Sequence, residues 1–238
     1  ERLEALDREK SAQDSARREG DRSRLVERAM IATLEAEEAM ADPNAPLPDL
    51  HAKLRRTIQD LEAGLREFPG DSRMMLWTGR SHELLWNDGE ALAWYGRAIA
   101  ADPGHAPSRY HRGRVLVRRY FESLFVWSAR GTKEREPLLK QAREDLEKAD
   151  GGRDVELLEC YRLLASGKSA EVARRVAERL RLGGRVEEFY FLAGVLQYQS
   201  KDYRAAVGHF TSALRLHPRH LYSYFHRALT HASLNEVE

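Results

Sequence analysis

Two stretches of the sequence decide the fold: 74–103, MMLWTGRSHELLWNDGEALAWYGRAIAADP, and 189–218, FYFLAGVLQYQSKDYRAAVGHFTSALRLHP. They align without a gap, so that Gly79 pairs with Gly194 and each stretch ends in proline. Each has apolar residues at helical spacing on both sides of a short polar turn, and its proline stops the second helix. The pattern therefore predicts a pair of antiparallel helices that occurs at least twice.

The two stretches resemble the tetratricopeptide repeat, a unit of two helices over 34 residues. Small residues stand at positions 8, 20 and 27 of that repeat, an aromatic residue at 24 and proline at 32. The matching residues are Gly79, Ala91, Ala98, Tyr95 and Pro103 in the first stretch and Gly194, Ala206, Ala213, Phe210 and Pro218 in the second. Small residues let two helices approach closely, while the ring fills the space beside them. The resemblance implies an all-α fold, a right-handed solenoid of antiparallel helix pairs.

The repeat spacing extends along the rest of the chain. We expect a charged helical lead-in over 1–20, followed by an irregular solenoid over 21–238. The predicted units are 21–71, 72–105, 106–153, a degenerate unit at 154–186, 187–220 and a half unit at 221–238. In the first unit, the second helix is expected over 53–68, after an enlarged, proline-rich turn. Terminal repeats normally need a polar cap. The half unit therefore predicts either that the natural chain continues or that its last helix docks alone.

An insertion interrupts the unit at 106–153. Positions 8 and 20 of that unit are Gly113 and Ala142, which are much farther apart than in the two regular stretches. The extra residues are placed at 121–137, within and after the aromatic run RRYFESLFVWSARGTKERE at 118–136. The aromatic spacing predicts that the first helix is prolonged.

The insertion has predicted boundaries and two open interpretations. Gly131 is expected to end the prolonged helix, and Pro137 to begin the second helix in its first turn. An apolar projection needs cover. It either folds back on the N-terminal helix or presents a contact surface for a partner, formed by Phe121, Phe125 and Trp127.

Composition limits the classes of protein. Charged residues make up 32% of the chain, and no window approaches the roughly 18 apolar residues that a membrane-spanning helix needs. The single Cys160 excludes an internal disulfide and a thiolate zinc site, and it fits a reducing compartment. We therefore expect a cytoplasmic protein, although a larger parent protein could be anchored in a membrane. The net charge of +1 gives no general attraction to nucleic acid or to membranes.

One short motif suggests an enzyme, but its surroundings do not. SGKS at 166–169 ends as a phosphate-binding loop does, yet Arg162 stands where that loop needs its first glycine. The preceding residues predict a helix instead of a strand, so the motif is interpreted as a helix-helix turn with Gly167 as a cap. The sequence offers no convincing catalytic constellation, and we expect no enzymatic activity, cofactor or metal in this segment.

The histidines are interpreted as surface or turn residues. HPRH at 217–220 straddles a repeat boundary, and His226 and His231 are five residues apart, which is off one helical face.

The first helices of such a solenoid line its concave groove, through positions 2, 5, 9, 12 and 13 of each unit. The candidate groove residues are Arg73, Leu76, Arg80, Tyr110, Arg114, Arg118, Phe191, Tyr198, Tyr222 and Phe225. Arginine has a planar fork that suits carboxylates and stacks on rings. We therefore expect a protein or peptide ligand with acidic and apolar residues. The alternative is that these arginines are solvated or paired with acids of the chain itself.

Three functions follow from the resemblance. The first is a non-enzymatic protein-protein interaction scaffold that binds a segment of its partner in the concave groove. The second arises because a charged helix followed by irregular repeats also looks like the C-terminal region of large bacterial serine/threonine protein kinases, which implies a regulatory or sensor region of a larger enzyme. The third is self-association through the half unit at 221–238, whose Tyr224 and Ala228 would seek a partner.

Overall fold

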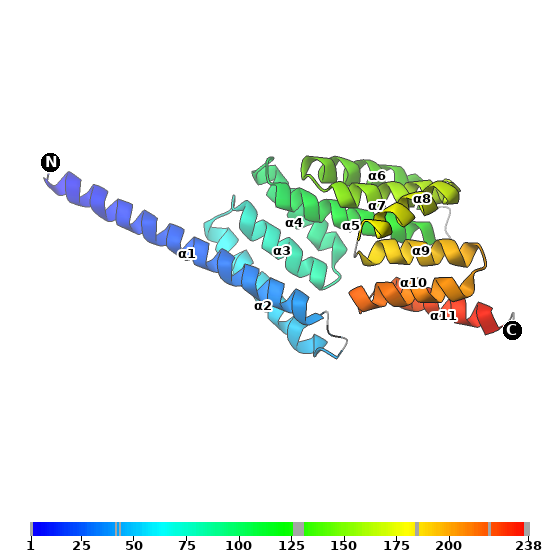
Figure 1. Cartoon of the computed structure of the whole chain (residues 1–238). Coiled ribbons are helices and arrows are strands. Elements are labelled where there is room, and N and C mark those ends of the chain that lie inside the picture. Colours follow the sequence, from blue (N-terminus) through cyan, green and yellow to red (C-terminus); the bar gives the residue numbers. More distant parts are fainter. Residues whose placement is uncertain are drawn as a thin grey trace. The chain divides into compact units, whose positions relative to one another are not determined.

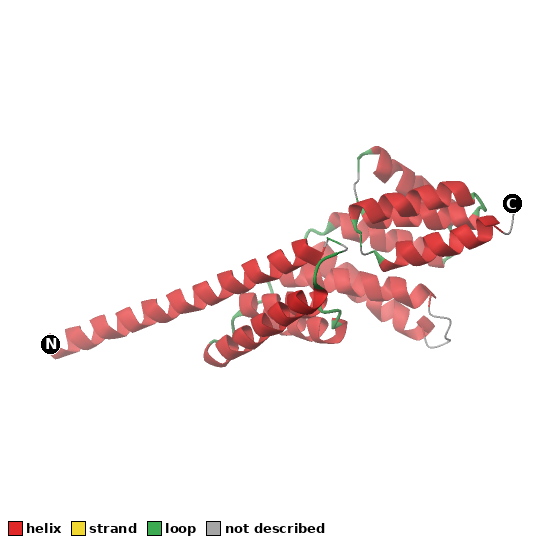
Figure 2. Ribbon diagram, turned by 90° about the horizontal axis from the view of Figure 1, so that it is seen from below, coloured by secondary structure: helices red, strands yellow, loops and turns green. Residues whose placement is uncertain are grey.

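The protein is helical throughout the residues that the structure describes. The computed structural model describes residues 2–40, 42, 44–125, 131–183, 186–218 and 220–235. Within these ranges there are eleven helices and no strand (Figure 1, Figure 2). They are α1 (Arg2–Met40), α2 (Leu47–Glu67), α3 (Ser72–Leu84), α4 (Asp88–Ala101), α5 (Ala106–Phe125), α6 (Gly131–Lys148), α7 (Gly152–Ala165), α8 (Ser169–Arg181), α9 (Glu187–Gln199), α10 (Tyr203–Leu216) and α11 (Leu221–Asn235). The predicted all-α fold of helix pairs is confirmed. None of these described helices is both long and apolar enough to cross a membrane.

The chain forms two compact units. The N-terminal unit consists of Glu1–Ala39 and Pro46–Val115, and the C-terminal unit consists of Met40–Ala45 and Leu116–Glu238. The boundary falls inside α5, so this helix belongs to both units.

Helix α1 joins the predicted lead-in and the predicted first repeat helix into one continuous element. Residues 7–19 are all exposed, and this half of α1 extends beyond α2 and α3 (Figure 1). The packed half begins near Arg22, whose Nε donates to Oδ2 of Asp71 at 2.5 Å. Gly64 of α2 lets α1 approach, because a Cβ at this position would overlap the side chain of Leu25.

Helix α2 begins earlier than the repeat spacing suggests. The sequence predicts the second helix of the first unit over 53–68, but α2 already starts at Leu47. Pro48 stands in its first turn, where the missing N–H costs no hydrogen bond. The proline-rich turn between α1 and α2 is therefore shorter than expected.

The two regular helix pairs, α3–α4 and α9–α10, share one close junction. A Cβ at Gly79 would lie 2.6 Å from Cε1 of Tyr95, and one at Gly194 would lie 2.5 Å from Cε1 of Phe210. Both rings are fully buried. Position 8 must therefore be glycine in these pairs because the ring at position 24 occupies the space of a side chain, as the sequence predicts.

The turns inside the helix pairs use left-handed backbone conformations. Trp86 and Lys201 stand at corresponding positions of the two regular pairs, with φ of 60° and 65°. Gly167, between α7 and α8, has φ of +73°. The SGKS motif is thus a turn between two helices with Gly167 as its left-handed residue, which confirms the interpretation from the sequence.

The insertion differs from the prediction at its second boundary. Helix α5 is prolonged as far as Phe125, as expected. Gly131, however, begins α6 instead of ending α5, and Pro137 lies inside α6 instead of starting it. A proline two turns into a helix removes one hydrogen bond, which a helix of 18 residues survives. Trp127 and the side chain of Phe125 lie outside the described residues.

The C-terminal unit has a cysteine where the regular pairs have glycine. Cys160 on α7 is fully buried, and it lies as far before the left-handed residue Gly167 as Gly79 lies before Trp86. Burial raises the pKa of its thiol to about 11. The chain contains no other cysteine. Cys160 therefore acts as a small core residue in the folded protein.

Candidate functional site

A cluster of charged side chains lies at the buried groove positions of α3, which are called the floor of the N-terminal unit below. Arg80 and Glu83 occupy groove positions of α3, yet their side chains are only 5% and 8% exposed. Nη1 of Arg80 donates to Oε2 of Glu83 at 3.0 Å, and its Nη2 donates to Glu37 of α1. One buried guanidinium thus joins two helices through two carboxylates.

Two further side chains complete this charged cluster. The hydroxyl of Tyr95 donates to Oε2 of Glu83 at 2.6 Å. Nδ1 of His111 lies 3.8 Å from the same oxygen, and the imidazole stacks on the ring of Tyr95 with centroids 5.9 Å apart. The charged cluster therefore consists of Glu37, Arg80, Glu83, Tyr95 and His111.

The pKa values in the charged cluster follow from burial and from Arg80. Burial alone would raise the pKa of Glu83, but Arg80, His111 and Arg114 bring it below its ordinary value. Burial, with a contribution from Arg80, lowers the pKa of His111 to about 3. Burial would also lower the pKa of Arg80, yet Glu83 and Glu37 raise it. At neutral pH Glu83 is thus ionised, Arg80 is charged and the imidazole of His111 is neutral.

A stacked pair lies next to the charged cluster. Cζ of Arg114 lies 5.8 Å from the ring centroid of Tyr110, a cation-π geometry. The edge of Tyr110 in turn meets His111, with centroids 5.3 Å apart and planes at 74°. Both Tyr110 and Arg114 are half-buried on α5. This face therefore presents a cation and a ring from adjacent turns of one helix.

The structure places the groove candidates of the N-terminal unit at different depths. Leu76 and Arg80 are buried, while Arg73, Tyr110 and Arg114 keep part of their surface in solvent. Nη2 of Arg73 lies 3.3 Å from Oδ2 of Asp71, which is the N-cap of α3.

Sequence reasoning missed three members of the charged cluster, which are Glu37, Glu83 and His111. Glu83 follows Arg80 by three residues at another groove position, a spacing that brings side chains together on a helix. That spacing was the available signal for Glu83. Glu37 and His111 come from other helices, and nothing local marks them.

A cluster of rings takes the equivalent place in the C-terminal unit. Phe191 on α9 is fully buried, and the ring of Phe121 meets it edge to face at 5.3 Å. The same ring of Phe121 lies 4.8 Å from Tyr161 on α7 and 4.9 Å from Tyr222 on α11. His226 adds a contact to Phe191 at 5.3 Å. These five residues are named the aromatic cluster below.

The aromatic cluster bears on two interpretations of the sequence. Phe121, the first residue of the insertion, is 4% exposed, and its ring packs on Tyr161 and Phe191 of the C-terminal unit. His226 is not a surface residue, because its ring packs on both Phe191 and Phe210. His220 likewise packs on Phe191, and burial lowers its pKa to about 4.

The remaining candidates of the C-terminal unit are more accessible. The hydroxyl of Tyr198 lies 3.3 Å from Oγ of Ser233. Arg118 is half-buried, and Phe225 is 63% exposed. Other large apolar side chains on α11 are also exposed, namely Leu221, Tyr224 and Leu229.

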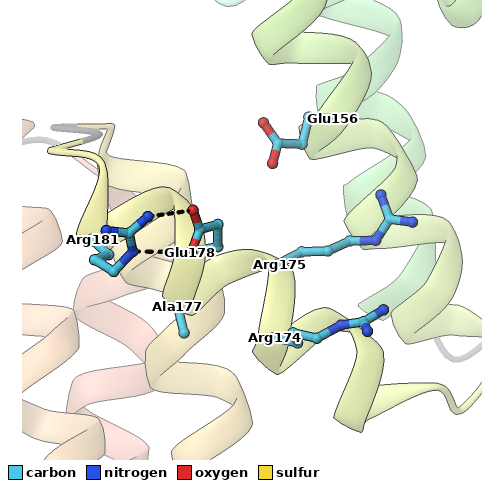
Figure 3. Close-up of a pocket in the computed structure, with 6 residues that line it drawn as sticks. All are labelled: Glu156, Arg174, Arg175, Ala177, Glu178 and Arg181. Atoms are coloured by element: carbon cyan, nitrogen blue, oxygen red, sulfur yellow. Dashed lines mark hydrogen bonds and ion pairs between the residues drawn. The ribbon is translucent and has the colours of Figure 1, made fainter.

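A shallow hollow of about 640 Å³ opens beside α8, lined by Glu156, Arg174, Arg175, Ala177, Glu178 and Arg181 (Figure 3). Arg181 turns to Glu178 through two hydrogen bonds of 2.8 and 3.1 Å, and Arg175 donates to Glu171 at 3.0 Å. Arg174 and Arg175 extend to the same side of the helix (Figure 3). Ion pairs on an open surface, such as those of Arg175 and Arg181, contribute little to stability.

No group of three or more histidine, cysteine or acidic side chains within the described residues is arranged to hold a metal ion.

The comparison with known families agrees with the helix-pair geometry. Residues 52–106 and 191–238 match the family model of the tetratricopeptide repeat. These two segments are similar to tetratricopeptide repeats. The two matched segments include α3–α4 and most of α9–α11, so they fall on the helix pairs that share the glycine-aromatic junction. No curated protein sequence matches the chain.

Solved structures show the same fold at low sequence identity. A tetratricopeptide repeat protein from Parabacteroides merdae is 15% identical, with a TM-score of 0.51 over 88% of this chain and 98% of that one. The Cut9–Hcn1 hetero-tetramer of APC/C gives 16% identity and a TM-score of 0.52, over 90% of this chain and 41% of that one. These similarities establish the fold of stacked helix pairs.

Proposed function

We propose that this protein is a non-enzymatic interaction scaffold, and that the first helices of its N-terminal unit bind a segment of a partner protein. Tetratricopeptide repeats present stacked first helices as a continuous surface. The similar Cut9–Hcn1 structure is itself an assembly of different proteins, which supports this class of function.

The observation that carries the proposal is the Tyr110–Arg114 pair. Its guanidinium and ring lie 5.8 Å apart at groove positions 5 and 9 of α5, and both side chains keep part of their surface in solvent. Arginine carries a planar fork that matches a carboxylate, and the same group can stack on an aromatic ring. The ring offers apolar area at low entropic cost, because tyrosine has few rotatable bonds.

The charged cluster sets which arginine meets the ligand. Arg80 is buried and already held by Glu37 and Glu83, so it supports the floor of the groove. Arg114 and Arg73 lie nearer to solvent on neighbouring first helices. The partner segment therefore presents an acidic residue to one of these two arginines and an apolar residue to Tyr110.

The proposal is tested with peptides selected on the protein from a displayed random library. We expect enrichment of sequences that combine acidic and apolar residues. The double variant Tyr110→Ala with Arg114→Ala should bind a selected peptide at least about tenfold more weakly in fluorescence anisotropy, since a charged hydrogen bond contributes about 1.5–3 kcal/mol.

The matched control is Arg174→Ala, which removes an exposed arginine on another helix pair. Circular dichroism of each variant checks that the helices are retained. Equal affinity of the double variant and the original protein, or an equal loss in the control, would contradict the proposal.

A further inference from the structure

We propose that the insertion of this chain is an internal ligand of its own C-terminal repeats, with Phe121 seated where an aromatic side chain of an external partner binds. The inference concerns the C-terminal unit and does not depend on peptide binding by the N-terminal unit.

The contacts of Phe121 are not those of an ordinary repeat residue. In a solenoid each repeat touches only its neighbours in sequence. Phe121 belongs to α5, yet its ring contacts Tyr161 on α7, Phe191 on α9 and Tyr222 on α11. Helices α7, α9 and α11 are the first helices of three successive units, so a side chain that meets all three lies across the face that they share.

The three residues that meet Phe121 are groove residues by their place in the repeat. Tyr161 lies as far before the left-handed residue Gly167 as Arg80 lies before Trp86, so it corresponds to position 9 of the regular unit. Phe191 and Tyr222 occupy positions 5 and 2 of their units. Positions 2, 5 and 9 are the ones expected to hold a peptide. The end of α5 thus occupies a ligand position of the C-terminal unit.

The geometry of the seat is that of specific aromatic recognition. The ring of Phe121 lies edge to face on Phe191 and on Tyr222, with planes at 87° and 85°, and tilted at 39° on Tyr161. Edge-to-face arrangements at centroid distances of about 4.5–7 Å are the favoured ones for aromatic pairs. The seat leaves the ring 4% exposed.

The repeats have their own core without Phe121. His226 packs on Phe210 at 5.8 Å, as His111 packs on Tyr95 at 5.9 Å in the N-terminal unit. Phe210 closes on Gly194 as Tyr95 closes on Gly79. These contacts belong to the repeat and occur in both units. Phe121 is an addition to them, supplied by the insertion that sets this unit of the chain apart.

The seat indicates the chemistry of the external partner. A helical segment that presents a phenylalanine or another aromatic side chain fits the space between Tyr161, Phe191 and Tyr222. Such a partner competes with Phe121, so its apparent affinity is reduced by the fraction of molecules in which the seat is empty. The insertion therefore keeps the C-terminal repeats closed until a stronger aromatic ligand displaces it.

The test uses a defined probe, a fluorescent synthetic peptide with the sequence LVRRYFESLF of residues 116–125. The full chain with Phe121→Ala should bind this probe about tenfold or more tightly than the original chain, because the end of α5 then competes for the seat without its ring. The same peptide with F121A should lose most of that binding. Anisotropy titrations at equal ionic strength measure both effects.

The matched control is Phe210→Ala, which removes a fully buried ring of the repeat core and should abolish cooperative unfolding of the C-terminal unit. Phe121→Ala should instead keep the helical circular dichroism signal and a cooperative transition. If Phe121→Ala remains folded and binds the probe no better than the original chain, the proposal is overturned.

A second variant decides the case in which Phe121→Ala fails to fold. Phe121→Leu keeps apolar volume but removes the ring, and it should still bind the probe more tightly than the original chain does. Absence of any gain for Phe121→Leu would make Phe121 a residue of the permanent core and would overturn the proposal. Loss of N-terminal binding through Tyr110 and Arg114 is measured with a different peptide, so the two failures are distinguishable.

Discussion

The two regular helix pairs have the same backbone arrangement, but the side chains at the floor of each unit differ in chemistry. Gly79 and Tyr95 close the first pair as Gly194 and Phe210 close the second. At the floor, however, the charged residues Arg80 and Glu83 of the N-terminal unit correspond to Val195 and Tyr198 of the C-terminal unit. One unit holds a buried ionic cluster, and the other holds aromatic rings that pack mainly edge to face.

The side chains that differ between the two floors differ together. The hydroxyl of Tyr95 donates to Glu83, and Phe210, the counterpart of Tyr95, carries no hydroxyl. Where the carboxylate is replaced, the donor that served it is replaced as well. A buried polar group left without its partner costs more than an apolar replacement of the whole set. The comparison teaches that these floors change as sets of residues.

The largest expected effect breaks the N-terminal set at one residue. Glu83→Gln leaves Arg80 buried with only Glu37 as its anionic partner and should destabilise the N-terminal unit by about 3 kcal/mol. Hydrogen exchange of α3 and α4, followed by mass spectrometry, measures this loss for the unit by itself.

The control replaces the set together. One chain with Arg80→Val, Glu83→Leu and Tyr95→Phe has an apolar floor. Its free energy of unfolding should lie within about 1 kcal/mol of that of the original chain. If the triple variant is less stable than Glu83→Gln, the floors are not interchangeable sets.

The next effect tests the feature that the units share. Gly79→Ala and Gly194→Ala each place a Cβ within 2.6 Å of a ring carbon and should each destabilise their unit by about 2 kcal/mol. Gly208→Ala is the matched control, since no atom lies within 4 Å of its Cβ, and it should stabilise α10 by up to about 1 kcal/mol. Thermal unfolding should show lower melting temperatures for Gly79→Ala and Gly194→Ala than for the original chain, and a higher one for Gly208→Ala. Similar melting temperatures for all three variants would refute the close-approach explanation.

The smallest effect is the pH dependence of stability, which depends on one buried histidine in each unit. The folded pKa of His111 is about 3 and that of His220 about 4, both below the ordinary value of 6.5. Between 6.5 and the folded pKa the unfolded chain binds the proton and the folded chain does not. Stability should therefore fall as the pH falls through this window, by at most about 1.4 kcal/mol per pH unit for each histidine.

Variants at single histidines assign this pH dependence to a unit. His111→Gln should flatten the dependence of the N-terminal unit, and His220→Gln that of the C-terminal unit. His231→Gln changes an exposed residue and should leave both curves unaltered. Denaturant unfolding between pH 7.5 and 5 measures the slopes, and identical slopes in all three variants would contradict the assignment.

Much of the fold was predictable because the repeat imposes a fixed register. The glycine at position 8 and the ring at position 24 announce their contact in the sequence, and the structure shows it at Gly79 and Gly194. The SGKS turn was predictable because Gly167 follows a helical pattern. The helix start predicted at Pro137 was wrong, because a long helix tolerates one proline in its interior although local rules place proline in the first turn.

The candidate site was predictable by position but not by partner. Register identified Arg80 and Phe191 as residues of first helices. It gave no sign that Glu37, far away in the sequence, would hold Arg80, or that Phe121 would reach Phe191. Such pairings depend on how helices from distant parts of the chain meet, and no local spacing records them.

Cys160 makes the protein its own probe. It is the sole thiol of the chain, it is fully buried, and its raised pKa leaves almost no thiolate at neutral pH. A disulfide reagent can therefore modify it only during moments when α7 separates from its neighbours. The rate of that reaction therefore reports how often the C-terminal repeats open locally, and it can be measured without a label.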